Sequence, residues 1–531
     1  MNVDTTSPQA PLADVKSKQD GASNEATAKA ESTTHDQNES SSIDERPVHS
    51  ALSERQRSAL LAVASFAAAI SPASTTTYYP AITTLANDLN VSITQINLSV
   101  SVYQLPAYQI FQGLAPTVAA AFSDRFGRRP VYLISLSINM AANLGLALQN
   151  NYASLMVLRC LQSSSSGGTV ALGQAVMDDL ITSEERGRYM AYLTLGLVMG
   201  PALGPLIGGL LSQYLGWRAI FWFLMILGGF FFLMVLTFFR ETNRSIVGDG
   251  WVPPQKWNRS LVQIFRKDKL VANPESLAEK RIGVNPLASI QILRNKENFI
   301  VCMYGALLFG GYASVISIFA TQLEERYGYS QVQVGLCYLP FGVGSILSRW
   351  TAGKMIDWNF KREADKQGFK IVKNRQQDLS RYDIEKARLT VSFPMIFATC
   401  GFVVAYGWLM QYNTHVASVL VVVFLIANVF TGVLIANSAL LNDLNPGNGA
   451  ALGAAMNLTR CLMGAGGVAA VTPLINKIGI GYTATATAGV WVATLPALYL
   501  IYSKGYTWRK AALEASSQDR RENPDVASGS P

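Results

Sequence analysis

Twelve long apolar runs constrain this chain more than any other feature of its sequence. Each run has about 20 residues, the length that a helix needs to cross a hydrocarbon layer about 30 Å thick. Backbone polar groups in a bilayer must bond within the protein, so such runs form helices, whereas a β-barrel would show shorter alternating segments. The predicted spans are 58–80, 96–121, 130–149, 153–178, 190–212, 218–239, 298–320, 331–352, 389–410, 416–440, 449–473 and 480–502.

The composition supports a multi-pass membrane protein. Half of the 531 residues are hydrophobic and only 15% are charged, whereas a soluble chain carries about 25% charged residues. The five cysteines fall inside predicted spans, which argues against a disulfide framework, and we expect no metal site and no cofactor. The sequence therefore predicts an all-α membrane protein that is not an enzyme.

Lysine and arginine gather in alternate loops, which sets the predicted orientation. Arg125, Arg128 and Arg129 follow the second span, and the segments 240–297 and 358–388 are also basic. Because basic loops stay in the cytoplasm, we expect both termini there. The formal net charge of +8 is explained by these loops, so no nucleic-acid partner is expected.

The ends of the chain differ from its centre. Residues 1–57 contain no Phe, Trp or Tyr and are rich in Ser, Thr, Ala, Asp and Glu, a composition typical of disorder. The predicted organisation is a disordered cytoplasmic tail, a first six-helix bundle, a cytoplasmic linker, a second six-helix bundle and a cytoplasmic tail, over residues 1–57, 58–239, 240–297, 298–503 and 504–531.

A short charged pattern occurs twice. The sequence AAFSDRFGRR (120–129) follows the second span, and GKMIDWNFKR (353–362) follows the eighth. In each, an acid, Asp124 or Asp357, precedes two adjacent bases at the same spacing. This repeat predicts two homologous, pseudo-symmetric halves, an architecture that secondary transporters use to hold cargo between two bundles.

These motifs resemble those of a known family. The stretch FSDRFGRRPVYL resembles the signature loop of the major facilitator superfamily, LRCLQSSSSGGTVALGQAVMDDL its arginine-bearing helix, and GLVMGPALGPLIGG the Gly-Pro motif of its antiporters. GWRAIFWFL, RET and YLPFGVGSILSRWTAGKMIDWNFK are similar to the fungal twelve-helix drug:proton antiporters, including quinidine-resistance and organic-acid-exporter relatives. One departure is Ala120, where the family usually has glycine.

The first motif is expected to form a gate. Asp124 and Arg128 lie one helical turn apart, where opposite charges can pair. The resemblance implies that this cluster reaches Asp179 and closes the cytoplasmic side of the transporter. The alternative is that the arginines only fix the topology. The predicted gating residues are Asp124, Arg125, Gly127, Arg128, Arg129, Asp179 and Asp357.

Arg159 is the most informative single residue. It lies two turns into the fourth span, where an uncompensated guanidinium is costly and usually marks a pathway, and Gln162 follows one turn later. The residue is expected to bind an anionic group of the cargo or to respond to protonation nearby. The alternative is a structural arginine satisfied by backbone carbonyls. Arg460 in the eleventh span raises the same two alternatives.

The fifth span carries a stripe of small residues. Its glycines recur every four residues and let another helix approach closely, and two prolines can kink the helix. We expect this stripe to meet the eighth span and to act as a hinge. The residues are Gly196, Gly200, Pro201, Gly204, Pro205 and Gly208.

The family analogy places the cargo pathway along the first, fourth, seventh and tenth spans. Tyrosine can grip apolar bodies while offering a hydroxyl group, and amides can bond polar groups. The predicted substrate-binding residues are Arg159, Gln162, Tyr78, Gln109, Tyr312 and Asn428.

The sequence thus predicts a monomeric plasma-membrane transporter of a fungal-type cell that exports small organic molecules, such as drugs, toxins or metabolites. Proton antiport and multidrug efflux are implied by the resemblance alone, since no acidic residue lies in the core of the first, seventh or tenth span. The alternatives are an organic-anion exporter or facilitator and, from another class, a transport-dead receptor or scaffold. A nucleotide-driven pump is disfavoured because no G-x-x-x-x-G-K-[ST] loop occurs.

Overall fold

The structure, a computed structural model, describes residues 54–89, 105–180, 186–248, 252, 254–266, 288–368, 382–445 and 449–522. All of them lie in the compact unit Leu52–Pro531. The expected disordered tail falls outside the described residues as far as position 53. The described part of the chain is helical and contains no strand, which confirms the predicted all-α class.

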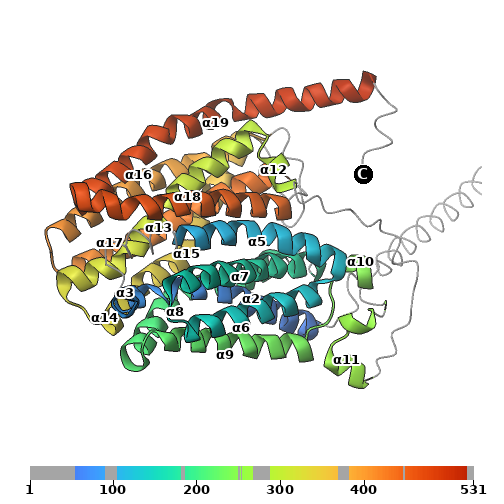
Figure 1. The fold of residues 1–531 in the computed structure, drawn as a ribbon. Coiled ribbons are helices and arrows are strands. Elements are labelled where there is room, and N and C mark those ends of the chain that lie inside the picture. Colours follow the sequence, from blue (N-terminus) through green and yellow to red (C-terminus); the bar gives the residue numbers. More distant parts are fainter. Residues whose placement is uncertain are drawn as a thin grey trace, which may run out of the picture. The chain divides into compact units, whose positions relative to one another are not determined.

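Twelve long helices follow one another in the described segments (Figure 1). They match the twelve predicted spans in order. They are α2 (Glu54–Thr76), α5 (Leu105–Phe126), α6 (Arg128–Leu148), α7 (Tyr152–Leu180), α8 (Arg186–Leu215), α9 (Arg218–Thr237), α13 (Lys296–Tyr327), α15 (Leu339–Lys366), α16 (Ile384–Gln411), α17 (Val416–Leu444), α18 (Gly449–Ile478) and α19 (Ile480–Glu522).

Short helices fill several connections. After α2 come η1 (Tyr79–Ala81) and α3 (Ile82–Asp88), and α14 (Gln331–Cys337) precedes α15. The predicted linker 240–297 contains α10 (Arg244–Val247), η3 (Lys256–Asn258), α11 (Leu261–Arg266) and α12 (Ala288–Ile292).

Among the described residues, eight helices are long and apolar enough to cross a membrane by length and composition. The other four long helices are α5, α7, α8 and α15. In α7 several polar side chains, among them Gln162, Ser163 and Thr169, are buried. Because they face neighbouring helices, they lower the hydropathy of the helix without being exposed to lipid.

The helices of the two halves pack in the same order. In the first bundle (α2 to α9) the packed pairs are α2 with α8, α5 with α7, α6 with α9, α6 with α7, and α2 with α7. In the second bundle (α13 to α19) they are α13 with α18, α15 with α17, α16 with α19, α16 with α17, and α13 with α17. The pairing of the first to sixth helices is thus repeated by the seventh to twelfth, as the predicted pseudo-symmetry requires.

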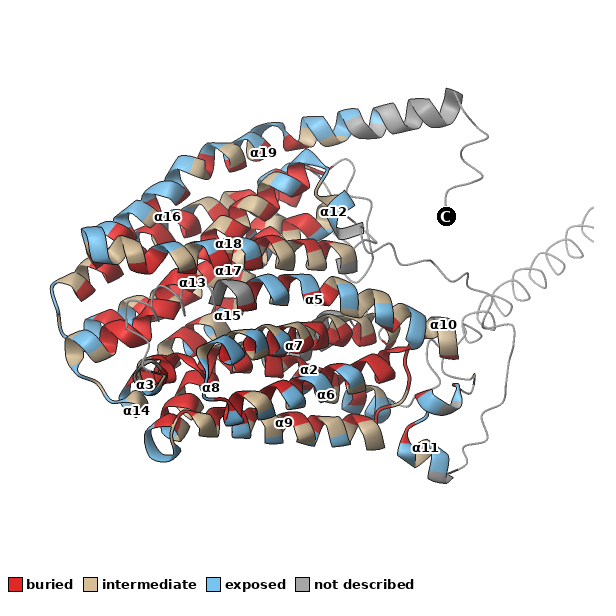
Figure 2. Cartoon of the chain, in the orientation of Figure 1, coloured by how far each residue is buried: buried red, intermediate tan, exposed pale blue. Residues whose placement is uncertain are grey.

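Two seams join the bundles. At one, α5 packs against α18, and at the other α8 packs against α14 and α15. The second helix of the first bundle thus meets the fifth of the second bundle, and the fifth of the first meets the second of the second. Figure 2 shows buried residues concentrated where helices face one another and exposed residues along the outer sides and ends.

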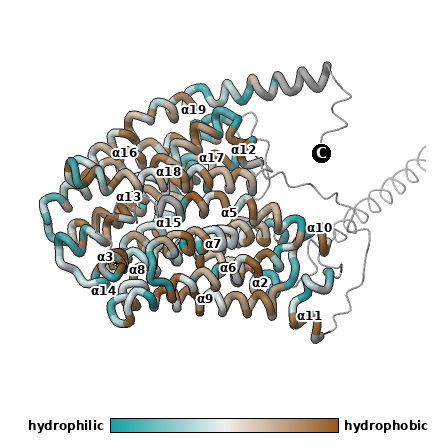
Figure 3. The backbone as a smooth tube through the Cα atoms, in the orientation of Figure 1, coloured by the Kyte–Doolittle hydropathy of each residue, from teal (hydrophilic) through white to brown (hydrophobic). Residues whose placement is uncertain are grey.

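Apolar side chains also cover outward-facing positions. Val157, Ile226 and Phe238 are all more than half exposed, and Figure 3 shows apolar stretches along the helices with hydrophilic residues near their ends. A soluble protein rarely exposes such a surface. It suits the hydrocarbon interior of a bilayer.

Two helices extend beyond their predicted ends. The last predicted span ended at 502, but α19 continues to Glu522, so the proposed boundary at 503 falls inside a helix. Likewise α15 continues to Lys366 instead of ending at 352. Polar residues past the apolar run prolong both helices, because helical propensity does not end where hydropathy does.

Candidate functional site

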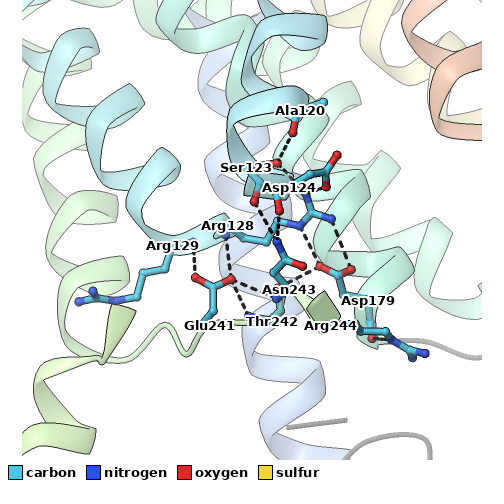
Figure 4. Close-up of polar contacts among 10 residues, drawn as sticks. All are labelled: Ala120, Ser123, Asp124, Arg128, Arg129, Asp179, Glu241, Thr242, Asn243 and Arg244. Atoms are coloured by element: carbon cyan, nitrogen blue, oxygen red, sulfur yellow. Dashed lines mark hydrogen bonds and ion pairs between the residues drawn. The ribbon is translucent and has the colours of Figure 1, made fainter. Parts of the chain in front are cut away.

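Arg128 stands at the centre of a buried charge cluster formed by Ser123, Asp124, Arg128, Asp179 and the segment 241–244 (Figure 4). Its Nε donates to Asp179 Oδ2 at 2.9 Å, and its Nη1 pairs with Asp124 and donates to Ser123 Oγ at 2.6 Å. The side chains of Arg128 and Asp179 are 9% and 11% exposed. One guanidinium therefore joins the end of α5, the start of α6 and the end of α7.

Glu241 completes the cluster from the segment after α9. Its Oε1 accepts hydrogen bonds from the backbone N–H of Arg128 at 2.8 Å, Thr242 at 3.1 Å and Asn243 at 3.0 Å. Its Oε2 accepts from Arg129 at 3.3 Å. The first N–H groups of a helix lack partners within it. No side chain of the N-cap residue Gly127 can supply one, so Glu241 takes the place of a cap.

Gly127 is required for this arrangement. Its φ of 106° lies in the region that favours glycine, and a Cβ at this position would overlap Glu241 Oε2. Burial raises the pKa of Glu241, while the backbone N–H donors act in the opposite direction. The motif glycine thus makes room for a carboxylate from a distant part of the chain.

Two further side chains tie helix ends to the same segment. Asn243 Nδ2 donates to the carbonyl oxygens of Ser123 and Asp124, both at 3.0 Å. Arg244 Nε donates to the carbonyl oxygen of Asp179 at 2.8 Å. Carbonyls at helix ends lack intrahelical partners, so these bonds hold α5 and α7 to the segment that follows α9.

Not every predicted gating residue belongs to the cluster. The side chain of Arg129 points elsewhere and donates to the carbonyl oxygens of Leu236 at 2.9 Å and Trp257 at 3.2 Å. Arg125 is exposed and lies over the ring of Phe126. The side-chain partners of Arg128 among the described residues all lie in the first bundle. The ion pairs of Arg128 therefore do not themselves bridge the two halves.

The second bundle has a counterpart of the Arg128 ion pair, but at other residues than the expected Asp357. Asp357 is exposed on α15 and forms no ion pair within the described part of the chain. Instead, Arg388 Nε at the start of α16 lies 3.0 Å from Asp443 Oδ2 at the end of α17. These helices are the counterparts of α6 and α7, so this pair corresponds to Arg128 and Asp179. The repeated motif did not identify this pair, because α15 continues past Asp357 to Lys366.

The long C-terminal helix adds a contact to this end of the second bundle. Arg509 Nη2 lies 3.1 Å from Glu385 Oε2 and 2.5 Å from the carbonyl oxygen of Tyr382. The Glu385 side chain is 0% exposed. The C-terminal part of α19 therefore binds the start of α16, as the segment after α9 binds the start of α6, but with the charges reversed.

Arg159 is buried within the first bundle and is only 1% exposed. Its Nη1 donates to the carbonyl oxygen of Ser74 at 3.1 Å and to Gln162 Oε1 at 2.7 Å. Gln162 Nε2 in turn donates to Asn143 Oδ1 at 2.7 Å. Two of the predicted substrate residues thus form one polar chain across α2, α6 and α7.

Aromatic rings surround the Arg159 guanidinium. Its Cζ lies 4.3 Å from the ring centroid of Tyr78, 4.9 Å from that of Tyr108 and 6.0 Å from that of Phe221. Its Nε and Nη2 have no hydrogen-bond partner, and no carboxylate pairs with it in the described residues. Cation–π contacts recover part of the cost of burying this charge, but the charge itself is not neutralised.

The remaining predicted substrate residues lie apart from Arg159. Gln109 is buried at the α5–α18 seam, facing Gly464, with its Oε1 unpartnered. Tyr312 stacks on Phe430 with centroids 4.0 Å apart. Asn428 Nδ2 donates to the Gly344 carbonyl oxygen at 3.1 Å and so braces α17 on α15.

The glycine stripe of α8 packs within the first bundle. A Cβ at Gly204 would overlap Thr76 Oγ1, and one at Gly208 would overlap the carbonyl oxygen of Thr77. Gly200 likewise faces Pro72. The stripe therefore meets α2 and the turn after it, not the eighth long helix as expected. The side chains of residues 186–199, and so the surroundings of Gly196, lie outside the described residues.

A different face of α8, which includes Pro205, meets the second bundle. Ala202 contacts Gly342 of α15, and the carbonyl oxygens of Pro205 and Gln331 face Gly335 and Gly209 respectively. Close contact at this seam therefore depends on glycines of both bundles. The other proline, Pro201, also lies inside α8.

The sequence interpretation missed Glu241, Arg388 and Arg509 as parts of the two charged ends. Glu241 lies in the RET stretch, where an acid just beyond a span, followed by polar residues, was the available signal. Arg388 and Arg509 lie in ordinary basic stretches, and nothing local distinguishes them from exposed neighbours.

Comparisons with known proteins agree with this architecture. Residues 64–468 match the profile of the Major Facilitator Superfamily. The chain is 97% identical over its whole length, and over the whole of the relative, to the MFS-type transporter clz19 of Cochliobolus lunatus. It is 32% identical to citrate exporter 1 of Aspergillus niger, over 88% of this chain and 89% of the exporter.

A solved structure shows the same fold. The human organic anion transporter MFSD10 (TETRAN) superposes with a TM-score of 0.53 at 15% identity, over 84% of this chain and all of that one. The family match covers most of the chain, and the relatives are similar to it over nearly their full lengths. The chain is therefore a multi-pass membrane transporter of fungal type that belongs to the Major Facilitator Superfamily.

Proposed function

We propose that the protein exports small organic molecules that carry an anionic group, by alternating access of the two bundles. The observation that carries this proposal is Arg159, a buried guanidinium that has no carboxylate partner among the described residues. An arginine at the centre of a membrane helix costs about 2.5–3.5 kcal/mol on insertion scales. A transporter keeps such an uncompensated positive charge when cargo or a coupled site uses it.

The names of two similar proteins support an anionic cargo. One relative is named for citrate export, and the structural neighbour is an organic anion transporter. Both names describe those proteins. For this chain we choose an anionic cargo over a neutral or cationic drug because the Arg159 guanidinium is positively charged and has no carboxylate partner in the described residues.

Export against a gradient needs an energy source. The sequence has no nucleotide-binding loop of the G-x-x-x-x-G-K-[ST] type, so we propose exchange for protons at the plasma membrane, with both termini in the cytoplasm and the monomer as the working unit. The charge clusters around Arg128 and Arg388 would keep each bundle rigid while the bundles move against each other.

The test uses the purified full-length protein in proteoliposomes. Transport of labelled citrate, of mono- and dicarboxylates and of an uncharged drug is measured with and without an imposed pH gradient. We expect saturable carboxylate transport that the gradient accelerates. Equal rates with and without the gradient would reject proton exchange, and no transport of any carboxylate would reject the anionic cargo.

Variants of Arg159 test the residue that carries the proposal. Arg159→Gln should abolish carboxylate transport and affect an uncharged cargo less, and Arg159→Lys should retain part of the carboxylate activity. Arg125→Gln is the matched control, because Arg125 is exposed. Equal losses for charged and uncharged cargo would remove the role of Arg159 as counter-charge.

A further inference from the structure

Arg349 on α15 is a second membrane arginine that has no ion-pair partner among the described residues, and sequence patterns did not single it out. It is half-buried, and within the described residues it has no hydrogen bond, ion pair or aromatic contact. It lies between the apolar stretches of a membrane-spanning helix, where ionisable side chains usually face a pathway. Packing alone therefore does not explain why an arginine stands at this position.

The helix geometry shows which way Arg349 faces. Gly342 contacts Ala202 of the first bundle so closely that a Cβ would overlap it. Arg349 follows seven residues later, which on an α-helix is only about 20° away around the axis. Gly344 and Ala352, which pack on α17, lie about 140° and about 60° from Arg349 around the same axis. Arg349 therefore projects along the side of α15 that meets the first bundle.

Arg460 occupies a related position at the other seam. Its Nη2 donates to Asn457 Oδ1 at 3.1 Å, and Asn457 Nδ2 donates across the seam to the carbonyl oxygen of Gln112 at 3.2 Å. Its Cζ lies 5.0 Å from the ring centroid of Phe309 on α13. Its Nε is buried without a partner, and no carboxylate pairs with it in the described residues.

Both arginines lie in the cytoplasmic half of their predicted spans. Arg460 lies eleven residues after the start of α18 at Gly449, which is about 16 Å along the helix axis. Arg349 lies eight residues before Asp357, which marks the same charged end of α15, or about 12 Å. Arg460 thus lies deep in its span, whereas Arg349 lies about 5 Å inside the predicted end of its span at 352. One more unpartnered polar atom, Gln109 Oε1, faces Gly464 one turn beyond Arg460.

We infer that two cationic positions on the side of the second bundle that turns toward the first, Arg349 at one seam and Arg460 at the other (the second site), bind carboxylate groups of the cargo. This inference rests on the proposed function, because it assumes an anionic cargo. It adds that the second bundle contributes its own counter-charges, so that cargo with several carboxylates is preferred. Arg159, enclosed within the first bundle, then acts separately from this site.

The test compares citrate with lactate as probes in proteoliposomes that contain the full-length protein. Arg349→Gln and Arg460→Gln should each raise the half-saturating citrate concentration at least tenfold and change that for lactate much less. Arg349→Lys and Arg460→Lys should restore part of the affinity. The controls are Arg362→Gln on α15 and Lys477→Gln on α18, exposed positions on the same helices.

A second measurement needs no substitution and so does not depend on the variants folding. The wild-type protein is treated with phenylglyoxal with and without citrate, and modification of each arginine is followed by mass spectrometry. Citrate should protect Arg349 and Arg460 but not Arg362. Equal modification with and without citrate, or unchanged citrate affinity in folded variants, would overturn the second site while leaving anionic export standing. If the wild type transports no carboxylate, the proposed function and this inference fail together.

Discussion

Arg128 Nε lies 2.9 Å from Asp179 Oδ2, and the same guanidinium pairs with Asp124. This contact links the loop between the second and third long helices to the end of the fourth. A corresponding contact, Arg388 to Asp443 at 3.0 Å, links the ninth and tenth. Each bundle therefore has an ion pair at the same place, although only the first is visible as a sequence motif.

Replacing Asp179 by Asn should destabilise the first bundle. Arg128 would keep Asp124 but lose Asp179, the more buried of its two carboxylate partners, and breaking a buried pair costs about 3 kcal/mol or more. The melting temperature of the purified protein should fall clearly. Arg125→Gln, at an exposed position, should shift it little. An unchanged melting temperature in Asp179→Asn would show that the ion pair does not hold the helices together.

The carboxyl group of Glu241 should make stability depend on pH. Burial raises its pKa from an ordinary value of 4.5, so the folded protein keeps this proton to a higher pH than the unfolded chain. The stability that this carboxyl group contributes is therefore greatest below pH 4.5. It is lost as the pH rises through the pKa that the group has in the folded protein.

Glu241→Gln should remove that pH dependence. The variant should also lose hydrogen bonds to the start of α6, at a cost of about 1–3 kcal/mol. Melting temperatures measured in steps upward from pH 4.5 check both effects. Glu514→Gln is the control, because Glu514 is exposed. The same slope in wild type and Glu241→Gln would contradict the assignment.

Replacing Gly208 by Ala should be costly even though alanine favours helices. The new Cβ would overlap the carbonyl oxygen of Thr77, a backbone atom that cannot move without displacing the end of α2. Such overpacking costs about 1–3 kcal/mol. Gly401→Ala is the control, since no atom lies within 4 Å of its Cβ. If both variants melt alike, the close approach of α8 to α2 is not as described.

Removing the charge of Arg509 should destabilise the second bundle. Glu385 would remain 0% exposed without its cation, and an uncompensated buried charge costs about 3 kcal/mol or more. We expect Arg509→Gln, or truncation after residue 503, to lower the melting temperature. Lys510→Gln should not, because Lys510 is mostly exposed. A truncated protein as stable as the full chain would show that the extension of α19 is dispensable.

Local sequence patterns predicted some of the contacts in the charge clusters and did not predict others. The spacing of Asp124 and Arg128 predicted a pair that the structure contains. The same spacing at Asp357 predicted a counterpart that does not form among the described residues. An ion pair needs a partner helix at the right place, and α17 offers Asp443 to Arg388 instead. The glycine repeat in α8 predicted close packing, but periodicity cannot say which helix fills the groove.

The sequence by itself determined that the chain has twelve membrane helices in two related halves, because the length of an apolar run and the bilayer's demand for internal backbone hydrogen bonds leave no other solution. Only the tertiary structure decided which charges meet. The partners of Arg128, Glu241 and Arg388 come from segments far apart in the chain. Burial and pairing depend on the neighbours that packing supplies, and no local pattern encodes them.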